Sequence, residues 1–250
     1  MTTTATCRFS VCPHDTAKNI LGWFLLNTYL QRKMDCAIHF EPCNSFIEEC
    51  GNVLSGDYQL VYTNPYSALL FDAELGFVPV ARPIGVFDET LLIASKEADL
   101  PAGQIRIAAA TDQLIVYDLG LDLLDQQNIS RLRCEFTFVG THLKAVHGLL
   151  QGNCDLAFVF NETWQGLSES TRSTLRVVAE SSSRQAYHCF CVAPGWLEKR
   201  ERLQQILCGM PDDPPGKLIL DDLHIQGFEA LPMNALDSLR ALVEKISPAP

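Results

Sequence analysis

The sequence predicts an α/β protein with mostly parallel sheets flanked by helices. From the N-terminus to about residue 193, short apolar stretches typical of strands alternate with segments whose apolar residues recur at helical spacing. Repeated strand–helix–strand units of this length favour parallel pairing. The hydrophobic fraction of 47% and the charged fraction of 20% also indicate a well-formed core and exclude global disorder.

The first part of the chain contains clear helix-start signals. Asp15 and Thr16 suit the N-cap of a first helix, and Pro65 suits the first turn of a third. Either Asn44 or Ser45 suits the N-cap of the second helix. Together with the apolar spacing, these signals predict strands at 8–13, 36–41, 58–62, 77–82 and 89–95, and helices at 17–31, at 45–55 and from residue 64 onward.

A similar run follows residue 101 and ends in a helical tail. The pattern predicts strands at 105–109, 134–139, 155–160, 175–179 and 187–193. It predicts helices at 112–126, 141–151 and 162–167, followed by helical segments at 196–208, 216–223 and 235–246. Two breaks interrupt the pattern, a charged stretch with Pro and Gly at 96–103 and a serine-rich stretch at 181–185. Two α/β units followed by a tail suggest two lobes.

The charge balance excludes several classes of partner. The formal net charge is −11 and the pI is about 4.9, so the overall field disfavours nucleic acid and anionic lipid. The N-terminal segment has no basic region followed by an apolar one, and the longest apolar stretches are shorter than a membrane span. We therefore expect no membrane insertion and a cytoplasmic location, or a periplasmic one if a leader has been removed.

The ten cysteines are expected to be reduced and mostly buried thiols. No CxxC pair occurs, and the one close pair, Cys189 and Cys191, is a weak metal signal by itself. The sequence contains no Walker loop and no GxGxxG, HExxH or GxSxG motif. We therefore predict no metal, no cofactor and no catalytic residue set.

Three stretches, taken in order, resemble a known family. They are residues 55–68 (SGDYQLVYTNPYSA), residues 139–157 with VGTHLKAV and LLQGNCDLA, and residues 218–228, where a helix is followed by IQGF. Their order and spacing are similar to those of the PhnD-like phosphate/phosphonate-binding proteins, a periplasmic group with the type II solute-binding fold. The resemblance covers nearly the whole chain.

The resemblance implies two lobes that bind a small-molecule ligand in the cleft between them. Residues 1–92 and 187–250 would form lobe one and residues 93–186 lobe two, with crossovers near 90–96 and 184–192. Each lobe would be a mixed, mostly parallel sheet flanked by helices. Ligands of such sheets bind beyond the carboxyl ends of strands, where helix N-termini hold an oxyanion through their N–H groups. An acidic chain can therefore bind an anion without Lys or Arg.

The strand-to-helix junctions are therefore the candidate binding site. By resemblance, Tyr66 and His142 fall near aromatic and imidazole groups that contact the ligand in the family, and Thr141 would cap a helix beside them. Cys12 follows the first strand, and a thiol at a helix N-terminus is reactive if it is exposed. The expected ligand-binding residues are Cys12, His14, Thr63, Asn64, Tyr66, Thr111, Asp112, Thr141, His142, Asn161 and Glu162.

One junction departs from the family pattern. Phosphonate binders carry a Ser-Thr-Ser-like run at the start of the first helix of lobe two, whereas residues 112–117 read DQLIVY. Each lost hydrogen bond to a charged oxygen costs roughly 1.5–3 kcal/mol, and Asp112 adds a negative charge. Tight phosphonate or phosphate binding is therefore not expected. The ligand is left open as another small anion, a neutral metabolite or none.

These observations favour a non-catalytic sensor or carrier that closes two lobes around a small anion or metabolite, with an unknown signalling or transport partner. Two alternatives stay open. The first is an enzyme on the same fold, with Cys12, His14, His142 and Glu162 as its candidate groups. The second is a transporter component whose leader was removed, which paired disulfides would favour.

Overall fold

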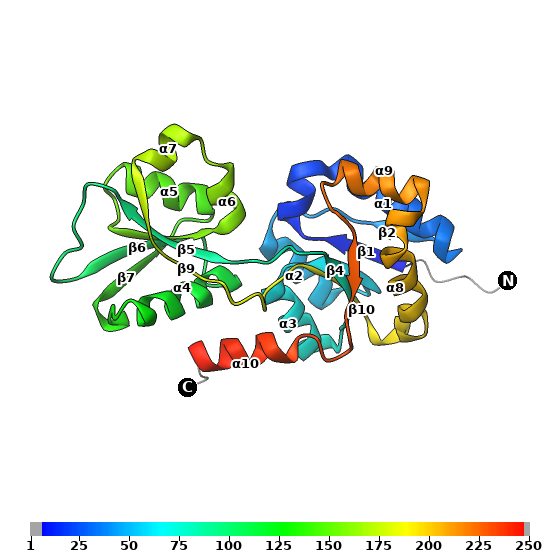
Figure 1. Cartoon of the computed structure of the whole chain (residues 1–250). Helices are drawn as coiled ribbons and strands as arrows, with labels where there is room; N and C mark the ends of the chain where they lie inside the picture. Colours follow the sequence, from blue (N-terminus) through cyan, green and yellow to red (C-terminus); the bar gives the residue numbers. More distant parts are fainter. Residues whose placement is uncertain (1–6, 248–250) are drawn as a thin grey trace. The chain divides into compact units, whose positions relative to one another are not determined.

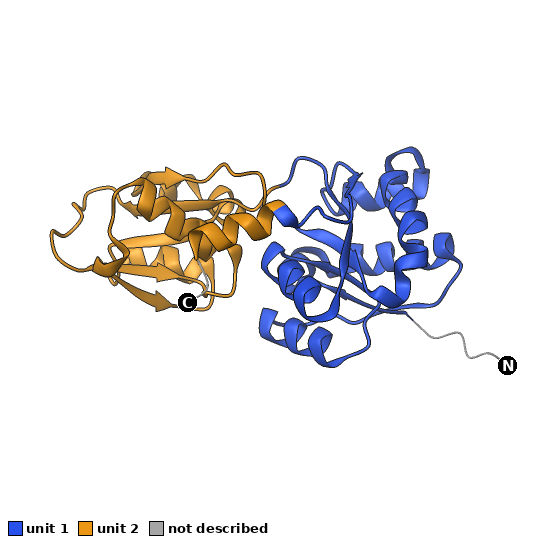
Figure 2. Ribbon diagram, turned by 90° about the horizontal axis from the view of Figure 1, so that it is seen from below, with its two compact units in different colours: residues 1–86, 187–237 blue, residues 87–186, 238–250 orange. Residues whose placement is uncertain are grey.

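The computed structural model of the chain describes residues 7–247, and the chain divides into two compact units (Figure 2). Unit 1 contains the chain up to Val86 and then Tyr187–Asp237, and unit 2 contains Phe87–Ala186 and the chain from Ser238. Each unit is a sheet flanked by helices (Figure 1), which confirms the α/β prediction. The sheets are mixed and not mostly parallel, because four of the strand pairs between residues 7 and 247 are parallel and five are antiparallel.

Unit 1 is built on a six-stranded mixed sheet in the order β11-β4-β10-β3-β1-β2. Strand β1 pairs in parallel with β2 and β3, whereas β10 runs antiparallel to β3 and β4. The strands are β1 (Cys7–Val11), β2 (Ile38–Phe40), β3 (Leu60–Thr63), β4 (Val78–Pro83), β10 (Cys189–Val192) and β11 (Phe228–Ala230). The helices are α1 (Pro13–Met34), α2 (Phe46–Ser55), α3 (Pro65–Leu75), α8 (Arg200–Cys208) and α9 (Pro214–Asp222), with 3₁₀ segments at Pro194–Lys199 and Met210–Asp212.

Unit 2 is built on a five-stranded mixed sheet in the order β7-β6-β8-β5-β9. Strand β6 pairs in parallel with β7 and β8, and β5 runs antiparallel to β8 and β9. The strands are β5 (Thr90–Ser95), β6 (Ile105–Ala109), β7 (Cys134–Phe138), β8 (Leu156–Phe160) and β9 (Leu175–Glu180). The helices are α4 (Ile115–Gln126), α5 (His142–Leu150), α6 (Asn161–Gly166), α7 (Glu169–Ser173) and α10 (Asp237–Ile246), with a 3₁₀ turn at Arg131–Arg133.

The strand directions bring several chain segments to one edge of each sheet. In unit 1 the antiparallel register places Cys189 opposite Thr63, so β10 begins where β1 and β3 end. In unit 2 Thr90 lies opposite Phe160, so β5 begins where β6 and β8 end. These edges, where helices begin, are where small ligands of open α/β sheets bind.

The core of unit 1 is centred on an aromatic cluster. The side chain of Phe190 in β10 is fully buried, and its ring centroid lies 4.9 Å from that of Tyr62, 5.4 Å from Phe228, 6.0 Å from Phe9 and 6.4 Å from Trp23. These rings come from β3, β11, β1 and α1. Phe190 therefore joins elements from both stretches of chain that make up unit 1.

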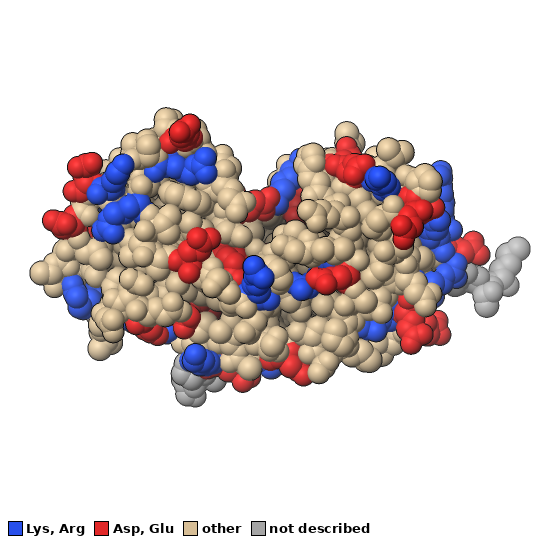
Figure 3. Space-filling model, viewed as in Figure 1, with Lys and Arg blue, Asp and Glu red and all other residues tan. Residues whose placement is uncertain are grey.

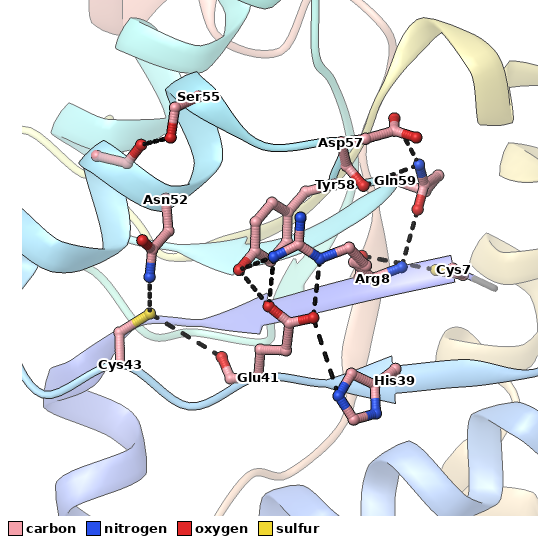
Figure 4. Close-up of polar contacts among 11 residues, drawn as sticks. Cys7, Arg8, His39, Glu41, Cys43, Asn52, Ser55, Asp57, Tyr58 and Gln59 are labelled. Atoms are coloured by element: carbon pink, nitrogen blue, oxygen red, sulfur yellow. Dashed lines mark hydrogen bonds and ion pairs between the residues drawn. The ribbon is translucent and has the colours of Figure 1, made fainter.

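A salt bridge connects β1 to the residue that directly follows β2 at one edge of this sheet (Figure 4). The guanidinium of Arg8 donates from Nε to Glu41 Oε1 at 2.8 Å and from Nη2 to Glu41 Oε2 at 2.6 Å, and the hydroxyl of Tyr58 also donates to Oε2 at 2.6 Å. The hydrogen bond from Arg8 lowers the pKa of Glu41 to about 2. The three side chains fix the ends of the β1, β2 and β3 segments against one another.

Helix α10 belongs to unit 2, whereas the resemblance implied that the tail completes lobe one. The backbone carbonyl of Ile246 accepts a hydrogen bond from Arg131 at 2.9 Å, and the hydroxyl of Ser247 donates to the buried carboxylate of Asp118 at 3.2 Å. These contacts join the end of the chain to α4 and the turn after it. They explain why residues 238–247 group with unit 2 and not with the tail before them.

The start of the first helix also differs from the prediction. Helix α1 begins at Pro13 and has Cys12 at its N-cap position, so Asp15 and Thr16 lie in its first turn and do not cap it. Proline is favoured at the first helical position because its missing N–H is not needed there. Among the other elements, β11, α7 and the 3₁₀ turns at Arg131–Arg133 and Met210–Asp212 were not expected. The helical segment predicted at 196–208 is a 3₁₀ segment followed by α8, and α4 begins at Ile115 instead of residue 112.

Candidate ligand-binding site

In unit 1 the end of β3 and the start of α3 hold three of the predicted site residues. Asn64 is the N-cap of α3: its Oδ1 accepts from the backbone N–H of Ser67 at 3.0 Å, and its Nδ2 donates to the Ser67 hydroxyl at 3.0 Å. The buried hydroxyl of Thr63 donates to Glu49 Oε1 at 3.0 Å. Tyr66, half-buried, lies in the first turn of α3. The Asn64 and Thr63 side chains therefore hold the α3 N-terminus in place.

The end of β1 holds the other two predicted residues of unit 1, Cys12 and His14. The backbone N–H of Cys12 donates to the carbonyl of Tyr62 at 2.7 Å, which fixes the end of β1 beside β3. The ring of His188, which directly precedes β10, stacks on Tyr62 at 5.9 Å and on His14 at 6.5 Å between centroids. The Nε2 of His188 also lies 3.5 Å from Oδ2 of Asp15.

Burial favours the neutral form of two acidic side chains in this part of unit 1, Cys12 and Glu49. Burial raises the pKa of the Cys12 thiol to about 12, an effect that the nearby imidazole of His188 opposes. Burial likewise raises the pKa of Glu49 to about 8, although the hydrogen bond from Thr63 opposes it. The side chain of Cys12 is fully buried, with 0% of its surface exposed, so the exposure that a reactive thiol at this helix start would require is not met.

In unit 2 the start of α5 follows the prediction. Thr141 is its N-cap and accepts from the backbone N–H of Lys144 at 3.2 Å. His142 is the first helical residue, half-buried, with its ring 5.9 Å from that of Phe160. Thr141 and His142 therefore lie at the edge of the sheet where β7 and β8 end.

The other predicted residues of unit 2 play different roles at the same edge. Asn161 accepts from the backbone N–H of Glu89 at 3.3 Å and donates to the carbonyl of Phe87 at 3.1 Å, so its side chain holds the start of β5. Thr111 accepts from the N–H of Gln113 at 3.2 Å in the turn before α4. The two acidic residues of the set, Asp112 and Glu162, are exposed.

Sequence reasoning missed three polar residues at these edges: Glu49, His188 and Glu89. Glu89 is buried at the start of β5 and accepts hydrogen bonds from the Ser181 hydroxyl and, at 2.7 Å, from the backbone N–H of Arg184. A signal existed for Glu49, because it lies four residues before the buried Val53 on α2. The partners of His188 and Glu89 are distant in the sequence and gave no local signal.

The comparison with known families decides where this chain belongs. A family model described as ABC transporter, phosphonate, periplasmic substrate-binding protein matches residues 9–234. The chain belongs to this phosphonate-binding family. The resemblance drawn from the three sequence stretches is thereby confirmed. Members of the family are solute-binding components of transporters and not enzymes, so the enzyme alternative is not supported.

Solved structures show the same fold at low identity. A Xanthomonas citri protein bound to chloride ion matches with a TM-score of 0.79 and 16% identity, covering 96% of this chain and 98% of that one. PhnD1 from Prochlorococcus marinus in complex with methylphosphonate matches at 0.75 and 14%, covering 98% and 99%. The periplasmic aliphatic sulphonate binding protein SsuA from Escherichia coli matches at 0.62 and 13%, covering 95% and 83%. No curated protein matches the sequence.

The family description bears on location as well. The phosphonate-binding family is periplasmic, and nothing in the comparisons supports the cytoplasmic location expected from the sequence. No helix between residues 7 and 247 is long and apolar enough to cross a membrane. The ten cysteines all fall within this stretch and all are free thiols.

Proposed function

We propose that this member of the phosphonate-binding family binds a small organic oxyanion with a single negative charge, of the sulfonate class, by closing its two units around it. The observation that carries the proposal is the start of α4, where an exposed aspartate precedes a buried apolar turn. The first-turn N–H groups of a helix attract an anion. Helix α3, beside Tyr66, and α5, beside His142, supply such groups.

The start of α4 disfavours a second negative charge on the ligand. Leu114, Ile115 and Val116 are buried in the core of unit 2, so no hydroxyl stands there to bind an additional oxyanion oxygen. Asp112 is exposed in the preceding turn and repels negative charge. On the face of each unit drawn in Figure 3, acidic and basic side chains are interspersed, and no large basic patch is present there among the described residues to attract an anion. Local hydrogen-bond donors must therefore hold it. The missing hydroxyls and the charge of Asp112 should therefore weaken the binding of a singly charged sulfonate less than that of a doubly charged phosphonate.

The test compares two ligands of nearly equal size, methanesulfonate and methylphosphonate, by isothermal titration calorimetry at mildly alkaline pH, where the phosphonate carries two charges. We expect the sulfonate to bind at least about tenfold more tightly, equivalent to about 1.4 kcal/mol. The variant Asp112→Ser should narrow this difference by improving phosphonate binding, and His142→Ala should weaken the binding of both anions.

The matched control is Asp122→Ser, which removes the same charge from α4 at a position away from its first turn. We expect this variant to prefer methanesulfonate over methylphosphonate by the same factor as the unmodified protein. Small-angle scattering should show a smaller radius of gyration with bound sulfonate. Tighter binding of methylphosphonate by the unmodified protein would refute the charge argument, and failure of both anions to bind would refute the proposal itself.

We propose further that the protein works in a compartment that keeps thiols reduced. Support comes from its ten free cysteines, including Cys189 and Cys191, whose buried sulfur atoms share a hydrogen bond at 3.5 Å and form no disulfide. Cells lysed directly into an alkylating reagent should yield protein whose cysteines are all modified, as counted by mass spectrometry of the unfolded chain. Disulfide-linked peptides in that sample would point to an oxidising compartment instead.

A further inference from the structure

Three metal-ligating side chains of different types meet in unit 1 where β1 ends and β10 begins. Cys12 is the N-cap of α1, Asp15 lies in its first turn, and His188 directly precedes β10. One ligand atom of each residue lies within 4.8 Å of those of the other two. We propose that these three side chains bind a divalent transition-metal ion of the zinc class.

The distances suit a tetrahedral ion. Bonds of about 2.0–2.3 Å place two ligands of tetrahedral zinc roughly 3.3–3.8 Å apart. The Nε2 of His188 and the Oδ2 of Asp15 are already 3.5 Å apart. Because no pair exceeds 4.8 Å, the widest separation must close by about 1 Å, which is within the reach of side-chain rotation.

The donor chemistry selects the ion. A thiolate, an imidazole and a carboxylate are ligands of zinc and of similar borderline metals, whereas Mg²⁺ and Ca²⁺ prefer oxygen ligands. The thiolate of Cys12 and the carboxylate of Asp15 together balance the two positive charges of the ion, which a buried site requires. Three protein ligands also leave one tetrahedral position for water or an anion.

The ring of His188 is held in one orientation before any metal binds. It stacks on the ring of Tyr62 with an interplanar angle of 20° and on the ring of His14 with an angle of 19°. The backbone of Cys12 is fixed by its 2.7 Å hydrogen bond to Tyr62. Ligands that are already ordered lose little conformational entropy when an ion binds.

A second observation at the same place points to a missing group. Glu49 is fully buried, and among the residues that the structure describes its Oε2 has no hydrogen-bond partner. Its carboxyl interacts electrostatically with Cys12, Asp15 and His188. A buried oxygen of this kind calls for a water or an ion that the chain itself does not supply. A metal-bound water beside Glu49 would satisfy it.

The test uses Co²⁺, which replaces zinc and reports a bound thiolate through a sulfur-to-cobalt charge-transfer absorption. We expect this absorption to saturate at one Co²⁺ per chain and to disappear when Zn²⁺ is added. Cys12→Ser should remove the absorption. His188→Gln and Asp15→Asn keep Cys12 as a ligand, so the absorption should remain, but each should weaken Co²⁺ binding at least about tenfold, equivalent to about 1.4 kcal/mol.

Two controls separate this site from general metal binding by thiols and imidazoles. Cys154→Ser removes a buried thiol of unit 2, and His39→Gln removes an exposed imidazole of unit 1. Neither substitution should change Co²⁺ binding. Circular dichroism checks that each variant is folded. The proposal is wrong if the folded, reduced protein shows no charge-transfer absorption with Co²⁺, or if the absorption survives in Cys12→Ser. This result is independent of which anion the protein binds.

Discussion

Phe190→Ala should destabilise unit 1 by about 3–5 kcal/mol, the usual cost of removing a buried phenylalanine ring. The ring is fully buried and touches aromatic side chains from four other elements, so little of the resulting cavity can collapse. Because the two units have separate cores, amide hydrogen exchange should speed up in β1 and β3 and stay unchanged in β6 and β8.

The control for this substitution is Phe24→Ala on α1 in the same unit. Phe24 is 43% exposed, and its ring packs edge-on against Phe40 at 4.9 Å between centroids, so its removal leaves no closed cavity and should cost about 1–2 kcal/mol, less than Phe190→Ala. Equal losses of stability in the two variants, or faster exchange in both units after Phe190→Ala, would contradict the view that Phe190 centres a core of unit 1 alone.

Asp118→Asn should stabilise unit 2 at neutral pH by about 1–3 kcal/mol. Burial raises the pKa of Asp118 to about 6, because desolvation outweighs the hydrogen bond from Ser247. The folded state therefore binds the proton more tightly than the unfolded state, and stability falls as pH rises from the unfolded pKa near 4 to the folded value. An asparagine keeps a hydrogen-bond acceptor for Ser247 and carries no charge.

The gain from Asp118→Asn should be largest above about pH 6 and vanish below about pH 4, where the aspartate is protonated in both states. Denaturant unfolding followed across this pH range measures it. Asp122→Asn, one turn along the same helix, is the control and should show no such pH-dependent gain. A stability difference that is constant with pH would show that Asp118 is not buried in its charged form at neutral pH.

The sequence was sufficient for features that depend on local chemistry. The Asn64-Pro65 pair and Thr141 were expected at helix starts, and the structure places the N-caps of α3 and α5 there because short polar side chains satisfy first-turn N–H groups. At Ser45 the same chemistry caps α2. The first helix was misplaced because two plausible caps, Asp15 and Thr16, obscured the proline signal at position 13.

Contacts between segments that are distant in the chain could not be predicted from the sequence. His188 reaches Asp15, and Glu89 reaches Ser181, only after strands of opposite direction have paired. Strand β11 has three residues, too few for a periodic pattern. A helical segment was predicted at 235–246, but its place in unit 2 depends on Arg131, which donates to the Ile246 carbonyl, and on Asp118, which accepts from the Ser247 hydroxyl.

The two units alternate along the chain, and their order determines which unit can fold first while the protein is made on the ribosome. Unit 1 needs Tyr187–Asp237 to supply β10 and β11, and these residues emerge only after nearly all of unit 2 has been made. The five strands of unit 2 and the apolar side chains packed on them all precede β10 in the chain. The nascent chain must therefore carry the unfinished apolar sheet of unit 1 while the whole sheet of unit 2 is being made.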